Sequence, residues 1–306
     1  MKTASPEARA HSLLTGLVLI WAVSWPVTKV GVSAMPPLWF ACLRYVVATA
    51  CCFGVVALRG ELRRPARGDW PLVAVSGVLQ MGAYSALTAT ALTQLAPGRA
   101  SVLAFSTPLW VVPLSAWWLK ERLTRRKVAG VGAGLVGVLV IASPGLAHAS
   151  RDQLLPYALL LCAAAAWAIS IVYVRVHRFQ TPTLALAPWQ MLVALLLLFP
   201  LAILLERRWP ILTPRAVAAL TFVGPIATAF AYWAAIEVGR SVRATTMSMV
   251  LLAVPSLGLL LLAVTLHESM SLSVTLGLVL VAAGIVATRA TVEPPQLPVH
   301  TLVHAK

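Results

Sequence analysis

The stretch WAVSWPVTKV, residues 21–30, returns later in the chain as WAISIVYVRV, residues 167–176. Four of the ten positions are identical, and two others exchange Val for Ile and Lys for Arg. The spacing is 146 residues, which is nearly half of the 306-residue chain. A phrase that returns at such a spacing indicates that the chain is built from two copies of one unit.

The composition decides the environment of these two units. The chain is 60% hydrophobic and 11% charged, with a mean hydropathy of +0.87. Soluble domains have about a quarter of their residues charged. Apolar runs of about 20 residues, enough to cross a hydrocarbon core of ~30 Å, recur from end to end. These features exclude a soluble globular protein and predict an all-α integral membrane protein.

Charged, Pro and Gly punctuation divides the apolar sequence into ten expected transmembrane helices. They lie at 13–33, 36–58, 70–93, 98–119, 127–143, 154–175, 183–205, 215–238, 243–266 and 272–290. The expected domains are a cytoplasmic N-terminus (1–12), a first five-helix repeat (13–147), a second repeat (148–290) and a disordered cytoplasmic tail (291–306). We expect the first span to be retained and not cleaved as a signal peptide, because its counterpart around Trp167 lies deep in the chain.

The net charge of +15 carries topological information. With the N-terminus inside, seventeen Lys and Arg residues fall in cytoplasmic segments and five on the opposite side. Such a bias predicts that both termini face the cytoplasm of a multi-pass inner-membrane protein. The basic residues are therefore not interpreted as a nucleic-acid surface, and membrane lipid is the expected surrounding.

Further matches extend the repeat over nearly the whole chain. Arg44 corresponds to Gln190 at a spacing of 146, and Pro108 to Pro255 and Glu121 to Glu268 at 147. Because each copy has five helices, an odd number, the second copy enters the membrane from the opposite side. The sequence thus predicts two inverted five-helix repeats around a central cavity, an architecture typical of secondary transporters.

Three segments carry a resemblance to a known family: WAVSWPVTKVG (21–31), LRYVVA (43–48) and TPLWVVPLSAWWLKERLT (107–124). Together they resemble the EamA-type transporters of the drug/metabolite transporter superfamily. The resemblance implies a ten-helix exporter or permease of amino acids, drugs, nucleotide-linked sugars or other metabolites, with helices one, three, four, six, eight and nine around the cavity. The second copy departs from the pattern, since HESMS (267–271) replaces KERLT (120–124).

The distribution of titratable groups argues against an enzyme. All six histidines and nine acids lie in loops, in tails or towards span ends, and there is no Walker A sequence. A membrane hydrolase or metalloenzyme needs a nucleophile, a base or metal ligands at depth. We therefore expect no catalytic residues, no metal and no cofactor. Without a central carboxylate, transport should be facilitated diffusion or exchange, unless Glu237 or Glu268 titrates.

Polar and aromatic side chains within the spans are the candidate substrate-binding residues. Gln80, Tyr84 and Thr88 share one helical face. The full candidate set is Trp21, Ser24, Gln80, Tyr84, Thr88, Trp110, Trp167, Ser170 and Tyr232. The alternative for a single Ser or Thr is a hydrogen bond to its own helix or a neighbouring helix. The indoles at matched depth favour a cavity instead, because Trp usually prefers the membrane interface.

The repeat also predicts gates and hinges. Lys29 and Glu268 are expected to meet at the outer end, and Arg175 and Glu121 at the inner end. The alternative is that each glutamate caps a helix or pairs with a loop arginine. The candidate hinges are the mid-span prolines Pro26, Pro108 and Pro255.

These observations favour a secondary transporter that moves a small molecule by alternating access, above all an exporter of neutral or aromatic amino acids. The rival within transport is a multidrug, organic-cation or other metabolite permease. The rival from another class is a non-transporting membrane scaffold or sensor. Gly130, Gly134 and Gly137 have the spacing of a close helix contact, which we assign to packing within a monomer, with a homodimer as the alternative.

Overall fold

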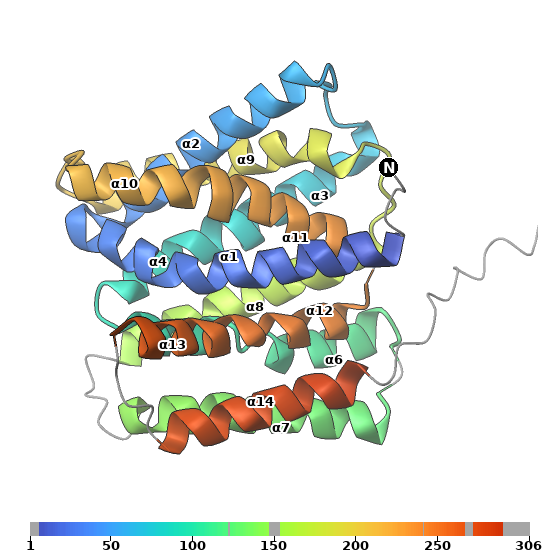
Figure 1. The fold of residues 1–306 in the computed structure, drawn as a ribbon. Coiled ribbons are helices and arrows are strands. Elements are labelled where there is room, and N and C mark those ends of the chain that lie inside the picture. The colour runs from blue at the N-terminus through green and yellow to red at the C-terminus, as the bar shows by residue number, and fades with distance from the viewer. Residues whose placement is uncertain (1–5, 122, 147–153, 241, 267–271, 290–306) are drawn as a thin grey trace, which may run out of the picture.

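The computed structural model describes residues 6–121, 123–146, 154–240, 242–266 and 272–289. Within these residues the protein consists of helices and connecting loops (Figure 1). The predicted all-α fold is therefore confirmed. Seven helical segments are long and apolar enough to cross a membrane, among the residues described: 10–34, 37–58, 67–92, 100–118, 154–176, 183–205 and 214–239.

The first repeat contains five helical rods, three of which are single helices and two of which consist of several helical segments. They comprise α1 (Pro6–Ala34), α2 (Pro37–Leu58), a third rod of η1 (Arg67–Asp69), α3 (Trp70–Val75), η2 (Ser76–Ala83) and α4 (Tyr84–Leu92), a fourth of α5 (Pro97–Ala104) and α6 (Pro108–Trp118), and α7 (Arg125–Leu146). Here η1 is a short 3₁₀ helix and η2 is a π-helical segment.

The second repeat follows the same plan. Its elements are α8 (Leu154–Val176), α9 (Thr183–Leu205), a rod of α10 (Pro214–Phe222), η4 (Val223–Phe230) and α11 (Ala231–Gly239), a rod of α12 (Ala244–Leu251) and α13 (Ala253–Leu266), and α14 (Leu272–Arg289). The π-helical segments η2 and η4 both have eight residues and begin 147 positions apart. Even the irregular helical geometry is repeated, so the two-copy organisation extends to the local backbone.

The two repeats run in opposite directions. In Figure 1, α1 and α8 cross the molecule in opposite senses, and so do α7 and α14. The start of α1 and the end of α14 lie at the same end of the bundle (Figure 1). The described rods are consistent with ten membrane crossings, but the count of ten stays a prediction.

Prolines set several helix starts. Pro37, Pro97, Pro108 and Pro214 each lie at the first position of a helix. Pro lacks a backbone N–H and has a fixed φ, so it is accepted at a first helical position. Pro108 therefore begins α6 after a break at residues 105–107, and does not interrupt a continuous span as the sequence suggested. Pro26 does lie inside a continuous helix, α1.

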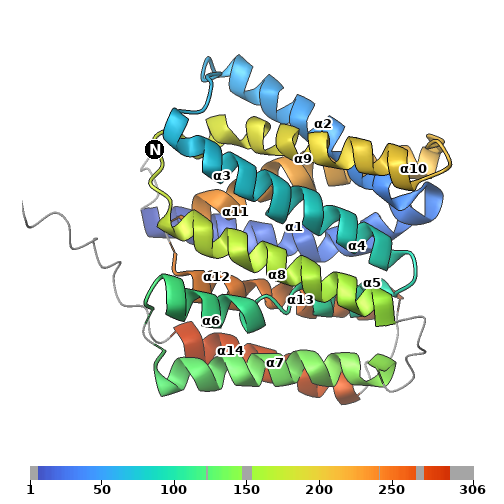
Figure 2. The ribbon, with the colours of Figure 1, turned by 180° about the vertical axis from the view of Figure 1, so that it is seen from behind.

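Glycines allow α7 and α14 to approach closely at one side of the bundle (Figure 2). A Cβ atom at Gly137 would lie 2.6 Å from the carbonyl oxygen of Gly277, and one at Gly284 would lie 2.5 Å from that of Gly130. Gly137 and Gly284 are matched positions of the repeat. The small-residue face of α7 thus packs within the chain, against the corresponding helix of the other copy.

A carboxylate caps α2 from the other repeat. Glu206, just beyond α9, accepts hydrogen bonds from the backbone N–H groups of Leu38 (2.7 Å) and Trp39 (3.0 Å). Negative charge is favourable at a helix N-terminus, where N–H groups lack helical partners. Burial raises the pKa of Glu206 above its usual range, although both hydrogen bonds oppose that shift.

Candidate functional site: a central aromatic pocket

The two repeated tryptophans meet at the centre of the protein. The rings of Trp21 (α1) and Trp167 (α8) lie 5.0 Å apart, edge to face at 86°. Trp21 is 5% exposed and Trp167 only 1%. An edge-to-face geometry places the positive rim of one ring on the negative face of the other, which stabilises aromatic pairs beyond their burial. The phrase that is written twice in the sequence therefore builds one contact between the two copies.

Other aromatic side chains complete the cluster. Tyr84 lies 4.5 Å from Trp167, and Tyr232 lies 5.5 Å from Trp21, measured between ring centroids. Phe105 contacts Trp167 at 5.5 Å from the broken fourth rod. Three rods of the first repeat and two of the second thus each supply one ring to the cluster.

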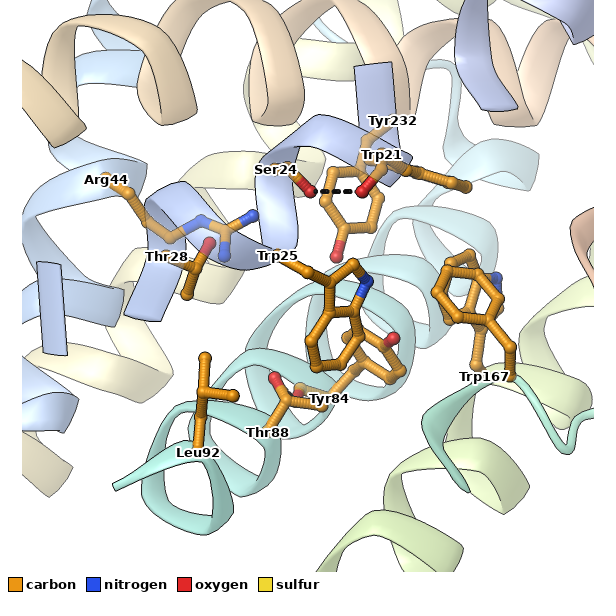
Figure 3. Close-up of a pocket in the computed structure, with 11 residues that line it drawn as sticks. Trp21, Ser24, Trp25, Thr28, Arg44, Tyr84, Thr88, Leu92, Trp167 and Tyr232 are labelled. Carbon is orange, nitrogen blue, oxygen red and sulfur yellow. Dashed lines mark hydrogen bonds between the residues drawn. The ribbon is translucent and has the colours of Figure 1, made fainter. Parts of the chain in front are cut away.

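These rings border a small pocket with about 40 Å³ of water-accessible space (Figure 3). Its lining consists of Trp21, Ser24, Trp25, Thr28, Arg44, Tyr84, Thr88, Leu92, Phe105, Trp167 and Tyr232. The lining residues of the third rod, Tyr84, Thr88 and Leu92, lie in α4, away from η1. A lining of mostly aromatic side chains with a few polar groups is typical of small-molecule sites.

Six of the nine predicted binding residues line the pocket: Trp21, Ser24, Tyr84, Thr88, Trp167 and Tyr232. Two of the hydroxyl groups are already bonded within their own helices. Ser24 donates to the carbonyl oxygen of Trp21 at 2.9 Å, and Thr88 to that of Tyr84 at 2.7 Å. Their oxygens can still accept a hydrogen bond from a ligand.

Gln80 and Ser170 are brought together, but outside the pocket lining. Ser170 Oγ donates to Gln80 Oε1 at 2.8 Å, and both side chains are buried. The contact joins η2 of the first repeat to α8 of the second. Their observed role is to connect helices next to the site, which is the alternative considered for such residues.

Trp110 lies away from the pocket, contrary to the position expected from the sequence. It is 39% exposed on α6, whereas Phe105 is 1% exposed and lines the cavity. Five residues correspond to about 500° along an α-helix, so the two side chains could not share one face even without the break between them. The non-helical residues 105–107 made this rod hard to read from periodicity.

The two central indoles differ in hydrogen bonding. Trp21 Nε1 donates to the carbonyl oxygen of Ala227, in the π-helical segment η4, at 3.0 Å. Trp167 Nε1 is buried and has no hydrogen-bond partner within the described protein. The repeat is symmetric in ring placement and asymmetric in the use of the ring nitrogen.

The lining also contains residues outside the predicted set. Trp25, Thr28, Leu92 and Phe105 lie at pocket depth, and Arg44 enters from α2. The sequence did carry a signal for Arg44, because it is the only basic residue well inside a span, but its neighbours on other helices could not be known.

A buried carboxylate, Asp69, connects the two repeats at the end of the bundle where the third rod begins. Asp69 Oδ1 lies 2.8 Å from His177 Nε2, and Oδ2 accepts the backbone N–H of Thr181 at 2.7 Å. Asp69 belongs to the first repeat, and both of its partners belong to the second. The side chain of Asp69 is fully buried.

The predicted gate residues have other partners in this conformation. Lys29 Nζ donates to the carbonyl oxygens of Leu92 (2.6 Å) and Thr93 (3.4 Å), at the end of α4. Arg175 Nη1 donates to the carbonyl oxygen of Arg240 (3.3 Å), at the end of α11. Thr93 and Arg240 are themselves matched positions, so both cations cap the same helix end in each copy.

The glutamate of the predicted inner gate, Glu121, has a different partner. Glu121 Oε2 accepts a hydrogen bond from Thr245 Oγ1 at 2.9 Å, and no ion pair joins it to Arg175. Glu268 lies outside the described residues. Among the residues described, no group of three His, Cys, Asp or Glu side chains is placed to hold a metal ion.

The fold and pocket define a class: a multi-pass membrane protein of two repeats with an aromatic pocket where the copies meet. The chain matches the EamA-like transporter family twice, at residues 8–143 and 154–290. It therefore belongs to the EamA-like transporter family, within the drug/metabolite transporter superfamily, and is a transporter.

Similar proteins span about three quarters or more of the chain. A probable amino-acid metabolite efflux pump of Salmonella typhimurium is 27% identical over 286 residues, covering 88% of this chain and 91% of its own. An uncharacterized transporter of Bacillus subtilis is 25% identical, with coverages of 89% and 94%. An aromatic amino acid exporter of Ancylobacter novellus is 27% identical, with coverages of 74% and 79%.

A solved crystal structure has the same fold. It is 24% identical in sequence and aligns with a TM-score of 0.72, covering 92% of this chain and 96% of the other. The arrangement of the helices is therefore shared with an experimentally determined protein.

Proposed function

We propose that this protein is a secondary transporter of the inner membrane that exports neutral or aromatic amino acids by alternating access. The observation that carries the proposal is the Trp21–Trp167 contact, in which one ring from each repeat forms the wall of a single pocket. Movement of one repeat against the other would open this wall to alternate sides.

The chemistry of the pocket supports an amino acid with an apolar or aromatic side chain. Tyr84, Trp167 and Phe105 offer ring faces and edges for stacking. The hydroxyl oxygens of Ser24 and Thr88 can accept hydrogen bonds from an ammonium group. Two relatives support the same substrate class, since they are named a probable amino-acid metabolite efflux pump and an aromatic amino acid exporter.

The proposal is tested by counterflow of radiolabelled phenylalanine in proteoliposomes that contain the purified protein. We expect uptake into vesicles preloaded with unlabelled phenylalanine or leucine, and background uptake into vesicles preloaded with an organic cation such as tetraethylammonium. Preferential exchange of the organic cation would favour a multidrug or organic-cation permease. Binding of all these compounds without exchange would favour a sensor or scaffold.

Two tryptophan variants sharpen this test. Trp167→Ala removes a ring from the pocket wall and should weaken phenylalanine binding by about 1–3 kcal/mol, as do other central hot-spot truncations. Trp110→Ala removes the same group from an exposed position on α6 and should leave binding unchanged. Equal losses in the two variants would contradict the assignment of the pocket.

A further inference from the structure

Arg44 brings an unusual charge into the pocket. Its Nε donates to Thr228 Oγ1 at 3.0 Å, and its guanidinium carbon lies 5.5 Å from the centre of the Tyr45 ring. The hydrogen bond holds the guanidinium at its Nε edge, and the Tyr45 ring makes a cation–π contact with it. In Figure 3 the guanidinium lies beside Thr28, on the same cavity as Trp25 and Tyr84.

Among the described residues, no hydrogen-bond acceptor lies within reach of the terminal nitrogens of Arg44. Among the residues the structure describes, no carboxylate lies within ion-pair distance of this guanidinium. The pocket lining contains no Asp or Glu at all. An unpaired charge at membrane depth is costly, and such residues commonly face a substrate pathway. With Nε occupied, both Nη atoms remain for a planar anionic group.

The second repeat shows that packing alone does not require this charge. The position of Arg44 is taken there by Gln190, which is 1% exposed and whose Nε2 has no partner in the described protein. Both residues sit where their backbones approach a glycine of a π-helical segment. A Cβ at Gly224 would lie 3.5 Å from the Arg44 carbonyl oxygen, and one at Gly77 would lie 2.7 Å from that of Gln190.

The pseudo-symmetric pocket is therefore electrically asymmetric. One repeat contributes a cation, and its counterpart contributes a neutral amide outside the lining. A substrate that enters this pocket meets a fixed positive charge on the α2 side and aromatic rings of Trp167 and Tyr84 on the α8 side. This arrangement distinguishes the two ends of a bound molecule.

We propose that Arg44 binds the carboxylate of the transported substrate end-on through its two Nη atoms, and that the aromatic wall holds the side chain. The proposal rests on the transport function proposed above and narrows it. The carboxylate is then the obligatory group, whereas the ammonium group is dispensable. Aromatic carboxylic acids that lack an amine bind, and aromatic amines that lack a carboxylate do not.

Three probes of one skeleton test this selectivity: phenylalanine, 3-phenylpropanoate and phenethylamine. Binding to the purified protein in detergent is measured by calorimetry, and exchange by counterflow in proteoliposomes. For the wild type we expect phenylalanine and 3-phenylpropanoate to bind, and phenethylamine to bind at least about ten-fold more weakly, the smallest effect typical of a lost charge-assisted hydrogen bond.

The variants are Arg44→Gln, which installs the residue of the second repeat, and Arg44→Lys, which keeps the charge. We expect Arg44→Gln to weaken binding of both carboxylates about 10–100-fold and Arg44→Lys to weaken it less. Arg59→Gln, at the exposed end of the same helix, is the matched control and should bind like the wild type. Melting temperatures establish that each variant is folded; if Arg44→Gln is not, the wild-type selectivity and Arg44→Lys decide.

The outcomes separate this proposal from the transport function. Phenethylamine binding as tightly as 3-phenylpropanoate, or carboxylate binding unaffected by Arg44→Gln, would overturn the role of Arg44 while leaving amino-acid exchange intact. Arg44-dependent binding without any exchange would support the carboxylate site and refute transport. Absence of binding for all three probes would overturn both.

Discussion

At the scale of single residues, Trp21 and Trp167 illustrate how a repeated side chain acquires two roles. Both rings occupy the centre of the molecule and touch each other. The indole N–H of Trp21 donates a hydrogen bond to the carbonyl oxygen of Ala227. Within the part of the chain that the structure describes, the buried Trp167 N–H has no hydrogen-bond partner, a feature that native proteins rarely tolerate outside functional sites.

This difference predicts unequal costs for the same substitution. Trp21→Phe should lower the free energy of unfolding by about 1–3 kcal/mol more than Trp167→Phe, because it leaves the buried Ala227 carbonyl without its donor. The two changes remove the same atoms, so the lost packing largely cancels in the comparison. Denaturant unfolding of both variants in micelles gives the difference. Equal costs, or a larger cost at Trp167, would contradict it.

At the scale of helices, the contact between α7 and α14 depends on matched glycines. Gly137→Ala should destabilise the protein by about 1–3 kcal/mol, because the new methyl group would meet the Gly277 carbonyl in a closely packed interface. Gly132→Ala on the same helix meets nothing within 4 Å and should be neutral or stabilising by up to about 1 kcal/mol. Thermal unfolding of the two variants tests this, and a costly Gly132→Ala would argue against the packing described.

A second prediction at this scale concerns the helix ends held by Lys29 and Arg175. If Lys29 serves as a cap for α4, Lys29→Arg should retain transport and Lys29→Gln should reduce both transport and stability, the latter by about 0.5–1.5 kcal/mol. Thermal unfolding and counterflow measure the two effects.

The gate hypothesis makes a different prediction for the other conformation of the carrier. There Lys29 would pair with Glu268, and Lys29→Glu combined with Glu268→Lys should restore the transport lost in each single variant. Since capping needs a cation at position 29 whatever occupies 268, we expect no rescue from the charge exchange. Full rescue would establish the gate in place of the cap.

At the scale of the whole molecule, the two ends of the bundle are not equivalent. Asp69 of the first repeat binds His177 and the Thr181 backbone of the second. The matched position of Asp69 is Ala216, which cannot form such a contact at the other end. The third rod contributes pocket residues only from its C-terminal half, such as Thr88 and Leu92. The contacts of Asp69, at the start of this rod, therefore close the end of the bundle away from these residues.

Asp69→Asn should therefore shift the carrier towards opening at this end. Loss of the charged acceptor weakens closure by about 1–3 kcal/mol, and populations shift accordingly. With the four native cysteines replaced, a cysteine at Thr28 reports access to the pocket from the far side through labelling by an impermeant thiol reagent. We expect slower labelling in Asp69→Asn than in the control Glu61→Gln. Unchanged labelling would mean that Asp69 does not bias the two states.

The sequence by itself determined the environment, the repeat and the central residue pair. Hydropathy fixes which segments can enter a bilayer, because an uncompensated polar backbone or side chain is costly there. The spacing of 146–147 residues predicts two copies, and the copies are visible down to the π-helical segments η2 and η4. Trp21 and Trp167 could be singled out because an indole at depth in both copies departs from the usual interfacial position.

Only the tertiary structure decided which polar groups share a space. Periodicity gives the face of one helix, but the partner of that face depends on packing between rods far apart in the sequence. Hence Gln80 could not be foreseen to bond Ser170, nor Lys29 to cap α4. Arg44 was visible as a lone charge in a span, but its free Nη atoms and the acid-free pocket around them depend on how both repeats pack.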